Sequence, residues 1–185
     1  MNFARADAIA RTVLYEGYNL YPYRPSALKN RHRWTFGGVF PKAWAAQERH
    51  DRCSLETQCL LEGGPDSEIE VRLRFLHIFA REIGALHQPL DALPADGEPP
   101  FTRTAWLELG DRLLIEWEEA REREVALPPC RLTKLLAAPA QIRFAYAAER
   151  DVEPVRGADG RIAALIIRGA KPLSGVLTAT ATPVA

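Results

Sequence analysis

The sequence predicts an α+β fold that is mostly β, with antiparallel, sandwich-like sheets and a short N-terminal helix. Short runs of alternating apolar and polar residues recur about every 8–12 residues, with Gly, Pro and Asp between them, a spacing that is typical of antiparallel sheets. One amphipathic helical pattern stands near the N-terminus. There is no βαβ rhythm and no glycine-rich phosphate loop, which argues against a doubly wound nucleotide-binding fold.

The first 41 residues predict the helix and then an irregular, aromatic stretch. Residues 5–16 form the helix, because Ile9 and Val13 lie one turn apart with charged residues between them. Residues 18–26 are expected to be non-helical, since their prolines bias the preceding residues away from the helical region. Residues 34–41 read as a strand that is interrupted by two glycines.

A β-hairpin over residues 52–62 and 68–79 is the clearest structural prediction. Cys53, Leu55, Thr57 and Cys59 fall on one face of the first strand, and a Gly-Gly-Pro-Asp cluster follows it. The second strand alternates apolar and charged residues, with His77 on its apolar face. We therefore expect His77 to be a hydrogen-bonded core residue and both cysteines to be small core side chains.

The rest of the chain predicts further strands and one proline-rich loop at residues 88–100. The Asp159-Gly160 pair is a typical hairpin turn. The final strand either inserts into the sheet, or the 185 residues are the N-terminal part of a longer protein. The predicted strands cover residues 103–109, 112–118, 116–125, 141–147, 152–156, 161–168 and 175–184.

Length and composition are those of a single folded domain spanning residues 1–185. The chain has 47% hydrophobic residues, and a chain of this size buries roughly 70% of its unfolded surface without needing a disulfide or a metal. No run approaches the ~20 apolar residues of a membrane span, so no membrane partner is expected. Charged residues interrupt any signal-like segment at the start, and the three cysteines are odd in number. We therefore expect a cytoplasmic protein.

Overall charge is balanced, with 24 Lys and Arg against 24 Asp and Glu. Residues 1–52 and 129–185 are net basic, whereas residues 53–128 are net acidic. The pattern suits the separate solvated faces of one fold, and also a basic patch and an acidic patch that serve a protein partner. The acidic run at 116–124 is expected to be a solvated face.

No sequence motif indicates a reaction, a cofactor or a metal. The candidate metal ligands are His50, Cys53, Cys59 and Cys130, and only the first two have the spacing of a zinc-binding pair. Because no second pair matches it, we expect no metal and no catalytic residue. A metal carrier, or an enzyme that assembles these residues with His77 in space, stays the alternative.

The distinctive block of the chain is residues 15–41, in which tyrosines and other aromatic residues interleave with basic ones. Such a block can anchor the helix to the sheet through cation–π contacts, or form a protein interface, because Tyr, Trp and Arg are the usual hot-spot residues. It can also bind nucleic acid through residues 24–34, although strong nucleic-acid binders usually carry a net basic domain. The candidate partner-binding residues are Tyr18, Tyr21, Tyr23, Arg24, Lys29, Arg31, Arg33 and Trp34.

The same block resembles the opening of a family of uncharacterised bacterial proteins encoded near uptake NiFe hydrogenase genes. The similarity runs over residues 7–41 and rests on Tyr15-Glu16-Gly17-Tyr18, on Leu20–Ala27, and on Arg33-Trp34-Thr35-Phe36-Gly37-Gly38. The resemblance implies an accessory, maturation or assembly role, and chains longer than 185 residues. It supplies no catalytic residue. We therefore expect a non-catalytic adaptor whose partner is a protein such as a hydrogenase subunit or a maturation factor.

Overall fold

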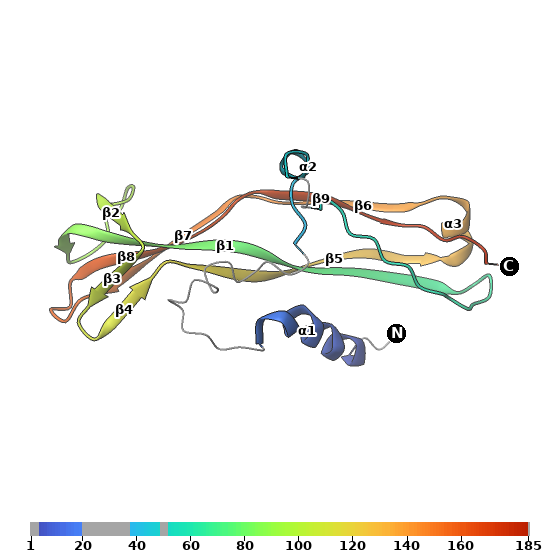
Figure 1. Ribbon diagram of the computed structural model, residues 1–185, viewed down its shortest axis with the longest axis horizontal. Helices are drawn as coiled ribbons and strands as arrows, with labels where there is room; N and C mark the ends of the chain where they lie inside the picture. The colour runs from blue at the N-terminus through green and yellow to red at the C-terminus, as the bar shows by residue number, and fades with distance from the viewer. Residues whose placement is uncertain (1–3, 20–37, 49–51, 185) are drawn as a thin grey trace. The chain divides into compact units, whose positions relative to one another are not determined.

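The computed structural model describes residues 4–19, 38–48 and 52–184 (Figure 1). These residues are mostly β with antiparallel pairing and a short N-terminal helix, which confirms the predicted fold class. The helices are α1 (Ala4–Asn19), α2 (Lys42–Ala45) and α3 (Leu132–Ala137). The strands are β1 (Glu68–Leu90), β2 (Phe101–Thr104), β3 (Trp106–Leu109), β4 (Arg112–Ile115), β5 (Trp117–Arg131), β6 (Ala140–Tyr146), β7 (Glu149–Arg156), β8 (Ile162–Ala170) and β9 (Leu173–Ala179).

The described residues fall into two compact units, and each is described by itself. The first unit contains the chain up to Leu73, together with Ala126–Ile142 and the residues from Leu177 onward. The second unit contains Arg74–Val125 and Arg143–Val176. Among the described helices, none combines the length and hydrophobicity that a membrane crossing requires.

A five-stranded sheet has the order β2-β1-β8-β7, and β5 also pairs with β1. The central strand β8 is buried on both faces because its sequence is almost continuously apolar. Ala164 and Ile166 belong to one hydrophobic cluster, whereas Ile162, Leu165 and Ile167 belong to another. The sheet therefore has apolar packing on each side.

A bulge in β8 explains why Ile162 shares a cluster with Leu165. Simple alternation would place these two side chains on opposite faces of the strand. Val155 pairs with Ala164, and the next residue of β7, Arg156, pairs with Ile162. Ala163 is therefore an extra residue of β8 with no partner in β7. The extra residue reverses the alternation, as β-bulges do.

The β7–β8 hairpin turns at the predicted Asp159-Gly160 pair. Gly160 has a φ of 78°, a left-handed conformation in which glycine is favoured. The backbone amide of Arg161 donates to Asp159 Oδ1 at 3.0 Å, and Arg156 donates to the Gly160 carbonyl at 2.6 Å. The turn residues therefore fix the register of the two strands, which confirms the hairpin prediction.

A small β3–β4 hairpin supplies apolar side chains to one face of the second unit. Leu114 is buried, and Leu107 and Leu109 pack against the same cluster as Ile83 and Ile166. The hairpin pairs Leu107 with Leu114 and Glu108 with Leu113. The hairpin turns at Gly110 and Asp111, between the strands that were predicted at 103–109 and 112–118, and Gly110 has a φ of 65°.

The proline-rich loop is shorter than predicted, since β1 continues to Leu90 and β2 begins at Phe101. Arg150 of β7 donates two hydrogen bonds of 2.7 Å to the Glu98 carboxylate in this loop. The hydrogen bond from Arg150, opposed by desolvation, lowers the pKa of Glu98 from its usual range. The loop is thus tied to β7 by a charge-assisted pair.

The predicted hairpin over residues 52–62 and 68–79 is wrong in its first half. Its second strand is the start of β1, but residues 53–63 belong to no helix or strand. β1 pairs instead with β2, β8 and β5, and all three strands follow it in the sequence. A strand pattern shows how side chains alternate but does not identify the partner strand, and here the long β5 takes that place.

In the remaining segments most predicted strands are present, with shifted ends. The N-terminal helix is confirmed as α1, but it continues to Asn19, so the prediction that residues 18–26 are non-helical is wrong for Tyr18 and Asn19. The strand predicted at 116–125 is present from Trp117 as the first part of β5. The strand at 34–41 is not formed over its described part: Val39 makes only an isolated bridge with Arg52, and residues 34–37 lie outside the described ranges. The last strand ends at Ala179, before the predicted residue 184.

Candidate functional site

The imidazole of His77 lies in the second unit and is 7% exposed. Its Nε2 atom lies 3.0 Å from the carbonyl oxygen of Lys171. Because a carbonyl only accepts, Nε2 is the donor in this bond. The expected hydrogen-bonded core histidine is confirmed. Nδ1 is buried and has no hydrogen-bond partner among the described residues.

Aromatic rings surround this imidazole. The ring centroids of Phe79 and Tyr146 lie 5.5 Å and 6.2 Å from that of His77. Phe75 lies 5.8 Å from Phe144 and 6.1 Å from Tyr146. Contacts at these separations stabilise a core through tilted and edge-to-face ring packing, so β1 and β6 are joined by an aromatic cluster.

Two arginines of β5 cover the aromatic cluster and bind one carboxylate. The Arg121 guanidinium lies 4.4 Å above the Phe79 ring, and that of Arg123 lies 4.5 Å above the Tyr146 ring. Both guanidiniums form ion pairs with Glu149 of β7. The hydrogen bond from Arg123, with the charges of both arginines, lowers the pKa of Glu149 despite desolvation.

A second ion-pair group centres on Arg168 of β8. Its guanidinium donates to Glu153 at 2.6 Å and to Glu119 at 2.9 Å. These carboxylates raise the pKa of Arg168, and the hydrogen bond to Glu153 makes the largest contribution. Glu119 also lies 3.9 Å from Arg81. The acidic run of β5 is therefore only partly the simple solvated face that was expected, since its carboxylates bind arginines of other strands.

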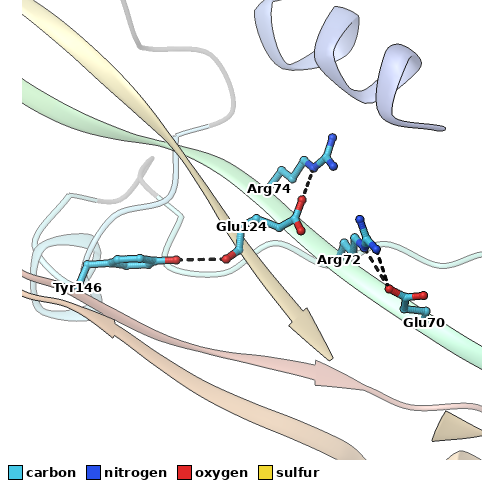
Figure 2. A network of polar contacts seen from close by, with 5 residues as sticks. All are labelled: Glu70, Arg72, Arg74, Glu124 and Tyr146. Atoms are coloured by element: carbon cyan, nitrogen blue, oxygen red, sulfur yellow. Dashed lines mark hydrogen bonds and ion pairs between the residues drawn. The ribbon is translucent and has the colours of Figure 1, made fainter. Parts of the chain in front are cut away.

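Figure 2 shows a third contact group, which joins three strands of the second unit. Arg74 of β1 donates to the Glu124 carboxylate at 2.7 Å. The Tyr146 hydroxyl of β6 donates to the backbone carbonyl of Glu124 at 3.3 Å. Along β1, the same figure shows Arg72 bound to Glu70 at 2.9 Å.

These clusters connect side chains of different strands through ion pairs and ring contacts. A carboxyl that acts as a general acid near neutral pH needs a raised pKa, and the arginines shift Glu149 in the opposite direction. The Nε2 atom of His77 is occupied by a backbone carbonyl. Paired charges and stacked rings of this kind hold strands in place and leave Glu149 ionised.

The described candidate metal ligands are the three cysteines, Cys53, Cys59 and Cys130. Cys53 and Cys59 are exposed, so the prediction that they are core side chains is wrong, because the strand that would have buried them is not formed. Cys130 is half-buried, and its thiol lies 3.5 Å from the Arg131 carbonyl. His50 lies outside the described residues. The described ranges contain no group of three or more His, Cys, Asp or Glu side chains that could hold a metal ion.

The candidate partner-binding residues fall almost entirely outside the described ranges. Tyr18 belongs to α1, and its side chain is not among those described. The others lie in residues 20–37, so their role stays a prediction: Tyr21, Tyr23, Arg24, Lys29, Arg31, Arg33 and Trp34.

One exposed apolar surface was missed from the sequence. The hairpin outer face, defined here as Trp106, Glu108, Leu113 and Ile115, is the side of the β3–β4 hairpin opposite the buried Leu114. Trp106 and Leu113 are each 59% exposed. The signal was present in Leu113-Leu114-Ile115, because three consecutive apolar residues in a short strand cannot all face one core.

Comparison of the chain with protein-family models, with curated proteins and with solved structures finds no match.

Proposed function

We propose that the protein is a non-catalytic cytoplasmic adaptor that acts through contacts with another protein. The hairpin outer face carries this proposal among the described residues. Tryptophan is strongly enriched in binding hot spots, and clustered apolar exposure is typical of docking surfaces. Trp106 pairs across the hairpin with Ile115, and Leu113 lies two residues before Ile115 in β4, on the same face.

The packing of its inner face fixes the hairpin in place, so its outer face is preorganised. Its inner side chains Leu107, Leu109 and Leu114 pack into a core cluster, while Trp106 and Leu113 stay exposed. The amide of Glu116 donates to the Ala105 carbonyl at 2.8 Å and extends the ladder beyond the strand ends. A preorganised apolar face loses little conformational freedom when it binds, which favours recognition.

The proposed partner is a protein of the uptake NiFe hydrogenase system, either a subunit or a maturation factor. This choice rests on the resemblance of residues 7–41. The basic and aromatic residues of that block, with Arg24 and Trp34 as representatives, form the second proposed contact region. Contacts of this kind need no bond-making step in the adaptor itself.

Co-purification from cells that express the uptake hydrogenase tests the proposal. Hydrogenase subunits or maturation factors should co-purify with the tagged full chain. The Trp106→Ser/Leu113→Ser double variant should recover at least ten-fold less of these proteins than the wild type does. Leu136→Ser is the matched control, because Leu136 is 45% exposed on α3, which belongs to the first unit, whereas the hairpin belongs to the second. Arg24→Ala and Trp34→Ala test the N-terminal block in the same way.

Two outcomes contradict the proposal. One is that hydrogenase proteins are absent from the recovered material while the chain is folded. The other is that all variants support wild-type hydrogenase activity and recovery. Circular dichroism of each variant verifies that lost recovery is not lost folding.

A further inference from the structure

Residues 53–61 form an exposed segment with a strand-like sequence and no strand partner. Their side chains are all exposed, with Leu55 at 72%, Leu60 at 85% and Leu61 at 58%. Their backbone makes no hydrogen bond to another described residue. Three large leucines held in water are unfavourable by about 25 cal/mol for each Å² of apolar surface that could be buried.

Apolar and polar residues alternate in this segment as they do in a half-buried strand. The odd positions Cys53, Leu55, Thr57, Cys59 and Leu61 form an apolar face. The even positions between them are Ser54, Glu56, Gln58 and Leu60, so of the three leucines only Leu60 falls on the other face. β-Strands bury one such face and leave the other in water. The segment therefore carries the pattern of a strand without the ladder that a strand needs.

β9 offers an edge that matches this pattern. In the described part of the chain it belongs to a two-stranded sheet and pairs only with β6, which leaves one side of its backbone unpaired. The strand has no charged residue and no proline. Its odd positions, such as Leu177 and Ala179, are half-buried, whereas Val176 and Thr178 are exposed.

The edge strand of the larger sheet is built differently. β7 carries alternating charges from Glu149 to Arg156 and a proline at Pro154. Charges and proline are the usual means by which proteins prevent an edge from pairing with another chain. β9 lacks this protection, so its unpaired side is open to strand addition.

We propose that β9 binds residues 53–61 of a second copy of this chain as an added strand, and that the exchange is reciprocal. The apolar face of the segment would continue the half-buried face of β9, and Glu56 and Gln58 would lie beside Thr178 in water. Every chain carries one donor segment and one acceptor edge, so two copies satisfy both in a closed two-fold dimer.

The ends of the segment favour a second copy over the segment of the same chain. At one end the Arg52 carbonyl accepts a hydrogen bond from Phe40 at 2.7 Å, and at the other the Ser67 carbonyl accepts one from Leu132 at 2.9 Å. Among the described strands, β9 pairs with β6 and not with this segment. The β9 edge of a second copy is not tied to these two contacts, so it can approach the segment while both of its ends stay bound in their own chain.

Oligomeric state and directed cross-linking test the proposal on the full chain. Wild-type protein should have twice the 20.7 kDa monomer mass in light scattering after size exclusion. Thr57→Pro removes one backbone donor from the added strand and should weaken the dimer at least ten-fold. Thr57 lies in a segment without secondary structure, so the melting temperature of the diluted monomer should be unchanged.

Native Cys59 serves as the cross-linking probe. In a Cys53→Ser/Cys130→Ser background, a cysteine introduced by Leu177→Cys or by Ala179→Cys should form an intermolecular disulfide with Cys59 under oxidised glutathione. Thr178→Cys is the matched control, because its side chain lies on the other face of β9 and should not cross-link. Side chains of neighbouring strands on one face are close enough for a disulfide.

Several results overturn the proposal. They are a monomeric wild type at millimolar concentration, a dimer that Thr57→Pro leaves intact, an intramolecular disulfide, or equal cross-linking at Thr178. Trp106→Ser/Leu113→Ser should leave the dimer unchanged, so failure of the adaptor proposal and failure of this one are distinguishable.

Discussion

The Nε2 atom of His77 donates to the carbonyl oxygen of Lys171 at a point just beyond the end of a strand ladder. The last pair of β1 with β8 is Ala80 with Gly169. Beyond it, a side chain of β1 takes over the role of a backbone donor. The buried Nε2 atom of His77 thereby finds an acceptor where the ladder has ended, as buried polar groups require.

His77→Phe is expected to destabilise the protein by about 1–3 kcal/mol, because the Lys171 carbonyl loses its donor while the aromatic packing is kept. His77→Gln retains a donor and is expected to lose less. Chemical denaturation followed by circular dichroism measures both. Equal stability of His77→Phe and wild type would show that the bond contributes nothing.

Glu149 is expected to make unfolding depend on pH in the acidic range. Its pKa is lowered in the folded state by Arg123 and Arg121, so its contribution is present above the ordinary glutamate value of 4.5 and is lost as the pH falls through the folded-state pKa. Glu149→Gln should flatten this part of the profile of unfolding free energy against pH. Glu62→Gln, at an exposed position, is the control and should leave the profile unchanged.

Gly175→Ala is expected to be destabilising by about 1–3 kcal/mol through overpacking. A Cβ atom on Gly175 would lie 2.5 Å from Cζ of Phe144, closer than non-bonded carbons approach. Phe144→Leu removes the far end of that ring, so the double variant should lose less stability than the sum of the single losses. Strict additivity in thermal melts would contradict this packing.

Leu114→Ala and Leu113→Ala give a matched pair within β4. Leu114 is 3% exposed and Leu113 is 59% exposed. Leu114→Ala should lower the free energy of unfolding by about 2–5 kcal/mol, because removal of the buried side chain leaves a cavity. Leu113→Ala should change it by less than about 0.5 kcal/mol. Urea denaturation distinguishes them, and similar losses would contradict the assignment of Leu114 to the core and Leu113 to the surface.

Local sequence patterns determined most of the elements of this protein. The 3.6-residue periodicity identified α1, and Asp159-Gly160 located the β7–β8 turn because the glycine there needs a positive φ. The apolar setting of His77 in β1 was also visible. These features depend on neighbours within a few residues, so the sequence carries them directly.

Only the tertiary structure decided which strands pair and which side chains meet. The strand pattern at residues 53–61 predicted buried cysteines, yet β5 pairs with β1 and those cysteines are exposed. The two arginines on Glu149 and the exposure of Trp106 likewise depend on strands brought together from distant parts of the chain. Pairing is a competition among all strands for the same edges, and periodicity within one strand contains no information about its outcome.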